Sequence, residues 1–251
     1  MKVATGVEML ALSAVLPDGP TVIHPVLIWD ENDVILVDAG LPGQVPAFRE
    51  EFAKAGVPFD RLNRIIVTHQ DLDHIGGLRE VLDSVSGKVE VVSHEVEAPY
   101  IQGDAAPTKM GKLQDLLKVV PEQKRPQIQA LMQSMKVGYE RLHVTVDRTV
   151  VHDEELPFCG GVTVIHTPGH TPGHISLYLR SGNVLVTGDA LFCEGGRLVL
   201  PPAFFCSDPA LAKESLKKLA AYDVETAVCY HGGVCKDDVN RRIAELASSG
   251  I

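Results

Sequence analysis

The chain has 251 residues, of which 45% are hydrophobic and 22% are charged, and its formal net charge is −10 at pH 7. This length and apolar content suffice for one sizeable core, so we expect a single domain over residues 1–251. The negative charge and the absence of any basic run longer than two residues disfavour a nucleic acid as partner. No stretch reaches the roughly 18 uncharged apolar residues of a membrane helix, so no membrane partner is expected.

The cysteines and the N-terminus indicate the compartment. An odd number of cysteines without a CxxC pair argues against a disulfide framework and a zinc ribbon. The first ten residues, MKVATGVEML, hold only a short apolar run and do not resemble a secretory signal. We therefore expect free thiols in a cytoplasmic protein.

Strands and helices alternate in the first part of the chain. Apolar β-branched runs bounded by turn residues predict strands, and Gly56 is placed to end a helix. The predicted elements are two strands within 22–37, a helix at 46–55, a strand at 64–68, a helix reaching residue 85 and a strand at 88–93.

Residues 95–142 differ from this pattern, because they contain no convincing strand. Met110, Leu113, Leu117 and Val120 share one helical face, and residues 128–135 place apolar side chains at i, i+3, i+4 and i+7. This segment is predicted to be an inserted helical cap.

Strands resume after the insertion. The predicted elements are strands at 143–151, 162–166, 175–179, 183–189 and 225–230, a helix starting at Asp208-Pro209 and a last helix at 236–248. Two strand-rich halves, each with helices, predict an α/β fold in which helices cover a two-sheet sandwich.

The segment HQDLDH follows a predicted buried strand and holds four metal-ligand candidates in six residues: His69, Asp71, Asp73 and His74. Imidazole and carboxylate together suit zinc, iron or manganese. Three more blocks also lie at strand ends. They are HTPGHTPGH at 166–174, Gly188-Asp189 and His231-Gly232-Gly233.

These four blocks, in this order, resemble the metallo-β-lactamase superfamily, whose pattern is HxHxDH, a histidine in a TPGH turn, an aspartate after glycine and a distant histidine. The resemblance implies an αββα sandwich with two divalent metal ions, zinc first, with iron or manganese as alternatives. One metal would be bound by His69, Asp71 and His170, and the other by Asp73, His74 and His231. Asp189 would bridge them. The subgroup that looks most similar is the small bacterial hydrolases that include acyl-homoserine lactonases.

The sequence departs from the family pattern at two positions. Asp71 stands where the family usually has histidine, which gives an HxDxDH motif. Phe192 stands three residues after the bridging aspartate, where the lactonases have a substrate-contacting tyrosine, so Phe192 is a candidate for the substrate pocket without the phenolic donor. Asp38, at the end of VILVDAG, is either a residue that orients a ligand imidazole or an aspartate that caps a turn.

The resemblance implies hydrolysis of a small-molecule substrate, namely an ester, a lactone or a thioester. A metal-bridging hydroxide would be the nucleophile, and Asp73 would orient it and pass a proton to the leaving group. The alternatives are an iron-dependent oxidoreductase acting on oxygen or persulfides, and a binding protein without catalysis. The apolar face of the insertion could also form the interface of a homodimer.

Overall fold

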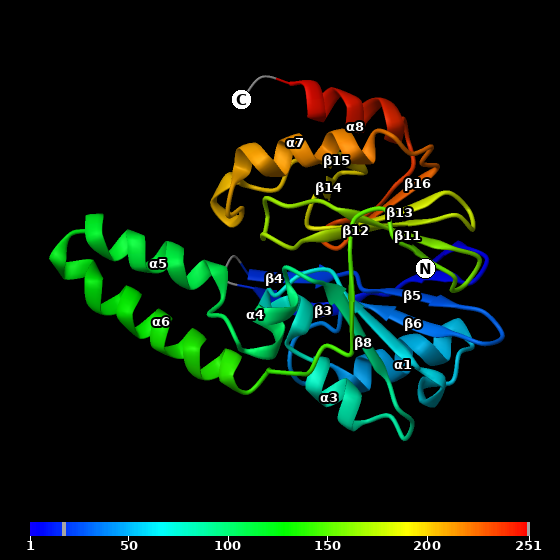
Figure 1. The fold of residues 1–251 in the computed structure, drawn as a ribbon, viewed down its shortest axis with the longest axis horizontal. Helices are drawn as coiled ribbons and strands as arrows, with labels where there is room; N and C mark the ends of the chain where they lie inside the picture. Colours follow the sequence, from blue (N-terminus) through cyan, green and yellow to red (C-terminus); the bar gives the residue numbers. More distant parts are fainter. Residues whose placement is uncertain (17–18, 250–251) are drawn as a thin grey trace.

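The computed structural model describes residues 1–16 and 19–249, which form two mixed sheets packed face to face (Figure 1). In this part of the chain, no helix has the length and apolar character needed to cross a membrane.

The first sheet has seven strands in the order β1-β2-β5-β6-β7-β8-β9. Their bounds are β1 Lys2–Ala4, β2 Val7–Met9, β5 Val26–Trp29, β6 Val34–Val37, β7 Arg64–Val67, β8 Glu90–His94 and β9 Arg148–Val150. Strands β6 to β9 run parallel to one another. The carboxyl ends of these four strands therefore meet at one edge of the sheet.

The second sheet has six strands in the order β10-β11-β12-β13-β16-β17. Their bounds are β10 Glu155–Leu156, β11 Val162–His166, β12 Ile175–Leu179, β13 Val184–Gly188, β16 Thr226–Cys229 and β17 Gly233–Cys235. Two hairpins lie outside the main sheets: β3 Leu12–Leu16 with β4 Gly19–Ile23, and β14 Phe192–Glu194 with β15 Arg197–Val199.

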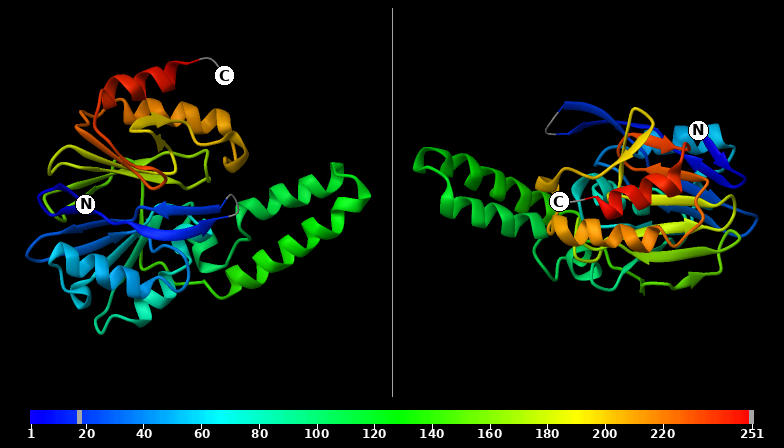
Figure 2. Two further views of the ribbon diagram at one scale, coloured as in Figure 1. Left: turned by 180° about the vertical axis from the view of Figure 1, so that it is seen from behind. Right: turned by 90° about the horizontal axis from the view of Figure 1, so that it is seen from above.

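Helices cover the outer face of each sheet, as Figures 1 and 2 show. On the first sheet lie α1 (Val45–Ala55) and α3 (Leu78–Asp83), and on the second lie α7 (Pro209–Leu219) and α8 (Val239–Ser248). Three apolar clusters fill the spaces between the layers. Phe48 and Phe52 of α1 pack on the outer face of the first sheet, and Ile66 and Leu177 lie between the two sheets. Leu216 of α7 packs on the outer face of the second sheet. The predicted αββα sandwich is confirmed.

Local signals determine several helix ends. Gly56 ends α1 with a φ of 73°, a left-handed conformation that costs glycine little. Asp208 begins α7 by accepting a hydrogen bond from the Leu211 N–H at 2.9 Å. Both ends were predicted from the sequence.

The helices between β8 and β9 are α4 (Ala98–Gln102), α5 (Thr108–Val119), the 3₁₀ turn η2 (Glu122–Lys124) and α6 (Arg125–Glu140). Helices α5 and α6 lie side by side and project away from the sandwich (Figures 1 and 2). We call residues 108–140 the helical arm. Residues 95–142, which include this arm, were expected to form a helical cap. Most of the arm points away from the sandwich, and its roots are the parts nearest the sheet edge.

One strand prediction was wrong in extent. A strand was expected over 143–151, yet only Arg148–Val150 pairs with β8. Val144 of this range and the preceding Leu142 instead belong to the core cluster of the first sheet, in the segment that leads the chain back from the arm. The alternating apolar residues of this segment reflect the packing of a connecting loop against the core, and not the pairing of a strand.

Candidate metal centre

The candidate ligands lie where strands of both sheets end, at the edge shared by the sheets. His69 comes two residues after β7, Asp189 directly follows β13, and His231 comes two residues after β16. Asp73 and His74 lie on α2 (Leu72–Ile75), a single turn that follows His69, and His170 lies on the loop after β11.

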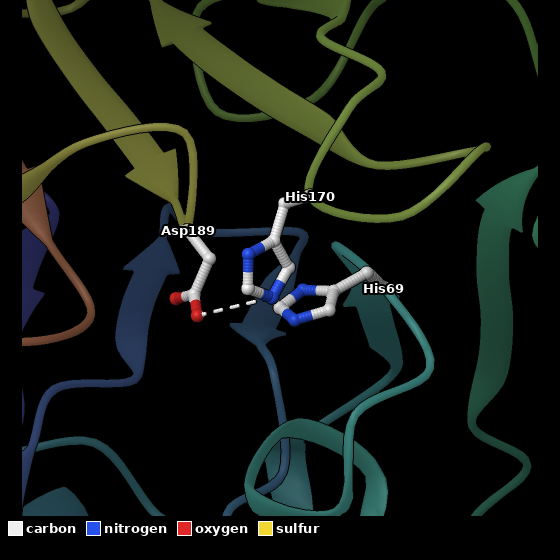
Figure 3. A group of neighbouring side chains, drawn as sticks. All are labelled: His69, His170 and Asp189. Atoms are coloured by element: carbon white, nitrogen blue, oxygen red, sulfur yellow. Dashed lines mark ion pairs between the residues drawn. The ribbon is translucent and has the colours of Figure 1, made fainter. Parts of the chain in front are cut away.

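His69, His170 and Asp189 form the first compact group. Their ligand atoms all lie within 4.8 Å of one another, and all three residues are buried. The side chains point toward one another from three separate loops (Figure 3). His170 Nε2 lies 3.4 Å from Asp189 Oδ2.

Asp73, His74 and His231 form the second group, with their ligand atoms again within 4.8 Å of one another. Asp73 Oδ2 lies 3.2 Å from His231 Nε2 and 3.7 Å from His74 Nε2. Asp189 contacts this group as well, because its Oδ1 is 3.4 Å from His74 Nε2 and its Oδ2 is 3.4 Å from His231 Nε2. Its carboxylate therefore stands between the two groups, where a bridging ligand would have to lie.

Asp71 adjoins the first group. Its Oδ2 lies 3.2 Å from His69 Nε2 and 2.9 Å from His170 Nε2. The same oxygen accepts a hydrogen bond from Lys109 Nζ at 2.5 Å. Asp71 is thus close enough to both imidazoles to share a cation with them, but it is also half of an ion pair, and its role as a ligand stays a prediction.

Asp38 lies behind the second group. His74 Nδ1 lies 2.8 Å from Asp38 Oδ2, which leaves His74 Nε2 to face the cluster. The Thr68 N–H and hydroxyl also donate to this carboxylate, at 2.8 and 2.7 Å. A carboxylate on the far nitrogen of a ligand histidine fixes its tautomer and ring orientation.

The three histidines of HTPGHTPGH have different surroundings. His170 reaches the first group, whereas the His166 ring stacks on His94, with ring centroids 4.0 Å apart, and His166 Nε2 lies 2.9 Å from the Pro172 carbonyl. His174 lies behind the site, where its Nε2 accepts the Asp189 N–H at 2.9 Å and its Nδ1 contacts Thr167. Of the three, His170 is the one that belongs to a ligand group.

A tight backbone places Asp189. Gly188 has a φ of 53°, and a Cβ at this residue would lie 2.6 Å from His174 Nε2. Only glycine fits this turn without displacing the histidine that holds the Asp189 N–H.

Glu97 joins the two ligand loops, and no sequence pattern marks it. Its buried carboxylate accepts from the Gln70 N–H and side-chain amide, at 2.8 and 2.9 Å, and from the Thr171 hydroxyl and Gly173 N–H, at 3.1 and 2.8 Å. Gln70 belongs to HQDLDH, and the other two residues belong to TPGHTPG. The four hydrogen bonds fix the two loops relative to each other.

Tyr230 is a second residue that sequence reasoning missed, although it directly precedes His231. Its ring stacks on His74, with centroids 3.8 Å apart, and its hydroxyl donates to the Asp73 carbonyl. Tyr230 therefore supports two residues of the second group at once.

The donor set fits divalent cations. His74 Nε2 and Asp189 Oδ1 are buried, face each other at 3.4 Å, and have no hydrogen-bond partner among the residues described. Burial of such atoms without partners costs free energy, which a cation bound between them would offset. Imidazole nitrogen and carboxylate oxygen are donors that zinc, iron and manganese accept.

Comparison with known proteins identifies the family. The sequence profile of the metallo-beta-lactamase superfamily matches residues 18–231. The chain belongs to this superfamily.

Its relatives include hydrolases. The chain is 30% identical over 217 residues to the probable metallo-hydrolase YflN of Bacillus subtilis, which covers 81% of this chain and 76% of that protein. It is 46% identical over 89 residues to a hydroxyacylglutathione hydrolase of Brucella ovis, about a third of either chain. A metallo-beta-lactamase family protein of Thermus thermophilus superposes with a TM-score of 0.74 at 25% identity, over 97% of this chain and 79% of that one.

In this metallo-β-lactamase superfamily member, the carboxylates control the protonation of the metal-free site. Burial would lower the pKa of His170, but Asp189 and Asp71 outweigh it and raise that pKa to about 9. The pKa of His231 is raised in the same way: Asp189 and Asp73 outweigh burial and raise it to about 10. Burial and the neighbouring His74 instead lower the pKa of His69 to about 4, despite the nearby Asp71.

We expect metal uptake to release protons and to strengthen as pH rises. His170 and His231 are protonated near neutrality in the metal-free protein, and a metal must displace those protons. Because both pKa values lie above the unfolded value of 6.5, these imidazoles stabilise the metal-free fold fully below about pH 6.5. That stability is lost as pH rises from about 6.5 through the folded pKa values of about 9 and 10, so the free energy of unfolding of the metal-free protein should fall between about pH 6.5 and pH 10.

The measurement is chemical unfolding of the metal-free protein at several pH values, beside proton release on zinc addition in weak buffer. His231→Gln should remove part of the pH slope, because it removes one titrating group. A free energy of unfolding that rises steadily from neutral to alkaline pH would contradict this assignment.

Proposed function

We propose that the chain is a metal-dependent hydrolase that cleaves a small ester, lactone or thioester at a site holding two divalent metal ions. The observation that carries the proposal is the position of Asp189, whose carboxylate contacts both ligand groups at 3.4 Å. The hydroxyacylglutathione hydrolase named above supports acyl transfer to water as the reaction, because its name describes removal of an acyl group from glutathione.

The reaction needs a nucleophile from water and a proton for the leaving group. Bound divalent metals supply Lewis acidity toward the acyl oxygen and lower the pKa of water toward neutrality. Water oxygen bonds to the acyl carbon, and the C–O or C–S bond breaks. The products are a carboxylate and an alcohol or thiol. The alcohol or thiol takes up one of the protons of water, and the other proton is released to solvent.

Asp73 would move that proton. Its carboxylate lies at the edge of the second group, 3.2 Å from His231 Nε2, and its side chain is 16% exposed, in contrast to 5% for Asp189. Asp73 can therefore contact both the metal group and a molecule entering from solvent, which a fully buried carboxylate cannot do. In the metal-free protein, His74 and His231 outweigh burial and lower the Asp73 pKa, so this carboxylate is ionised.

A covalent nucleophile from the protein is not required. Cys193 lies four residues after Asp189, but it is 6% exposed and its thiol donates to the Val234 carbonyl at 3.5 Å. Burial also raises the pKa of Cys193, which disfavours the reactive thiolate. Phe192 lies nearer to the site, with its ring centroid 4.7 Å from that of His231, and it offers an apolar wall to a substrate.

An iron-dependent oxidoreductase is the second candidate function. It is favoured by Asp71, because an additional carboxylate beside His69 and His170 makes this group harder and more suitable for iron(II) than an all-histidine set would be.

The two functions are separated by metal analysis and a paired assay. We expect untagged protein to hold up to two zinc, iron or manganese ions per chain, and to cleave members of a panel of lactones, p-nitrophenyl esters and acyl thioesters. Removal of metal with a chelator should abolish turnover, and each metal should be tested for restoring it. Oxygen consumption or persulfide oxidation without acyl cleavage would instead assign the oxidoreductase function.

A further inference from the structure

Lys109 brings a permanent positive charge to the metal centre. It is the second residue of α5, at the root of the helical arm, and its Nζ lies 2.5 Å from Asp71 Oδ2. Asp71 in turn contacts the Nε2 atoms of His69 and His170. The ammonium is therefore separated from the first ligand group by a single carboxylate.

The root of the arm is tied to the ligand loop, so this ammonium is held in place. The Thr108 N–H donates to Gln70 Oε1 at 2.8 Å, and Gln70 is itself fixed by Glu97. One turn further along α5, Lys112 Nζ donates to the carbonyls of Phe204 and Cys206. These bonds anchor α5 on both sides of Lys109.

Lys109 retains hydrogen-bonding capacity toward a ligand. An ammonium has three N–H donors, and the bond to Asp71 uses one of them. The Lys109 side chain is 31% exposed, in contrast to 5% for Asp71, so Lys109 is the partner of this ion pair that solvent reaches more easily. The Phe205 ring centroid lies 5.6 Å from Nζ, close enough to favour the charged form of the amine.

The apolar character of Phe192 makes such a donor important. Phe192 packs beside His231 of the second group and has no polar atom to offer an acyl oxygen. Lys109 lies beside the first group, where its ammonium contacts Asp71, and its side chain is partly exposed to solvent. A donor aimed at an oxygen that gains negative charge stabilises the transition state more than the ground state.

We propose that Lys109 is a catalytic residue that contacts the substrate, donating a hydrogen bond to the acyl oxygen as it becomes negatively charged and to the product carboxylate afterwards. This role rests on the proposed acyl hydrolysis. It assigns the root of the helical arm to the active site, and it explains how a site with Phe192 can still offer an acyl oxygen a donor from a side chain.

The test compares Lys109→Met with Lys118→Met, a matched control on the same helix whose side chain is 72% exposed and pairs with Asp115. We expect Lys109→Met to keep its metal and its melting temperature but to lose about 10²-fold or more in kcat, the usual cost of one oxyanion donor. Zinc affinity should be equal or higher, because a nearby positive charge has gone. Lys118→Met should match the parent in every measurement.

Binding of butyrate to the zinc-loaded protein, measured by calorimetry, gives a readout that does not depend on turnover. We expect about tenfold weaker binding to Lys109→Met than to the parent, and intermediate binding to Lys109→Arg, which keeps the charge. If Lys109→Met fails to fold, Lys109→Gln replaces it in both measurements.

Parental kcat and parental butyrate binding in Lys109→Met would overturn the proposal. Loss of metal in parallel with activity would also overturn it, because Lys109 would then act only by holding Asp71. If the parent cleaves none of the acyl compounds, the proposed function fails, and butyrate binding still decides whether Lys109 contacts a carboxylate.

Discussion

Asp189→Ala is expected to abolish turnover and to lower metal content at both groups together. The Asp189 carboxylate lies 3.4 Å from the Nε2 atoms of His74, His170 and His231, so it is the acid that contacts both groups. Removal of an outer partner of a metal ligand typically costs about 10- to 100-fold, so loss of a shared ligand should cost more than about 10²-fold in kcat/KM. Without the carboxylate, two metal charges would also face each other with less compensation.

The measurement is elemental analysis of each variant beside its kcat/KM. Asp115→Ala is the matched control, because Asp115 is exposed on α5 and contacts Lys118 away from the site. Thermal unfolding of the metal-free proteins shows whether Asp189→Ala still folds. A folded Asp189→Ala protein with full activity would rule out the shared-ligand arrangement.

The candidate ligand set was accessible from sequence because each block of candidate ligands carries its own local signal. HQDLDH concentrates ligand types directly after an apolar strand, and Gly188-Asp189 and His231-Gly232-Gly233 stand at the ends of other apolar strands. The structure brings Asp73, His74, His231, His69, His170 and Asp189 into two adjoining groups. The αββα layers were predictable for a related reason, since strand and helix patterns alternate in both halves of the chain.

The contacts that support the site were not accessible from sequence, because they depend on how distant segments meet. Lys109 is 38 residues from Asp71, and Glu97 is 27 residues from Gln70 and 76 from Gly173. Neither residue has a local pattern that distinguishes it from an exposed lysine or glutamate on a helix. Their roles follow from the direction in which α4 and α5 leave β8, which apolar periodicity does not specify.

The hairpins were missed for another reason. Strands β3 and β4 alternate between buried and exposed positions, but Gly19 and Pro20 open β4, and such residues usually indicate a turn. Strands β14 and β15 have three residues each, which is too short for a periodic signal. Phe192 nevertheless reaches the site through β14, beside His231.

Asp71 departs from the family motif, and substitution of this residue is expected to change which metal the protein prefers. Asp71, Asp73 and Asp189 place three carboxylates around the two groups, where the family pattern has two. Lys109 compensates one of these charges, since its ammonium lies on Asp71 Oδ2. In the metal-free protein, burial would raise the Asp71 pKa, but Lys109 and His170 outweigh it and keep the pKa well below its ordinary value. The Asp71 carboxylate is thus ionised, as a metal ligand would have to be.

We expect Asp71→Ala to lose metal selectively at the first group, while Asp73, His74 and His231 keep theirs. Asp71→His should shift the preference toward zinc, because a nitrogen donor replaces an oxygen donor and harder cations such as iron(II) and manganese(II) lose most. In Asp71→His the Lys109 ammonium has no carboxylate partner, so its positive charge opposes the metal. The double variant Asp71→His/Lys109→Met should therefore bind zinc more tightly than Asp71→His alone. Metal content and competition between zinc, iron and manganese should be measured for the three variants and the parent. If Asp71→Ala binds two metals as tightly as the parent, Asp71 is a partner of Lys109 and not a ligand, and the first group is complete with His69, His170 and Asp189.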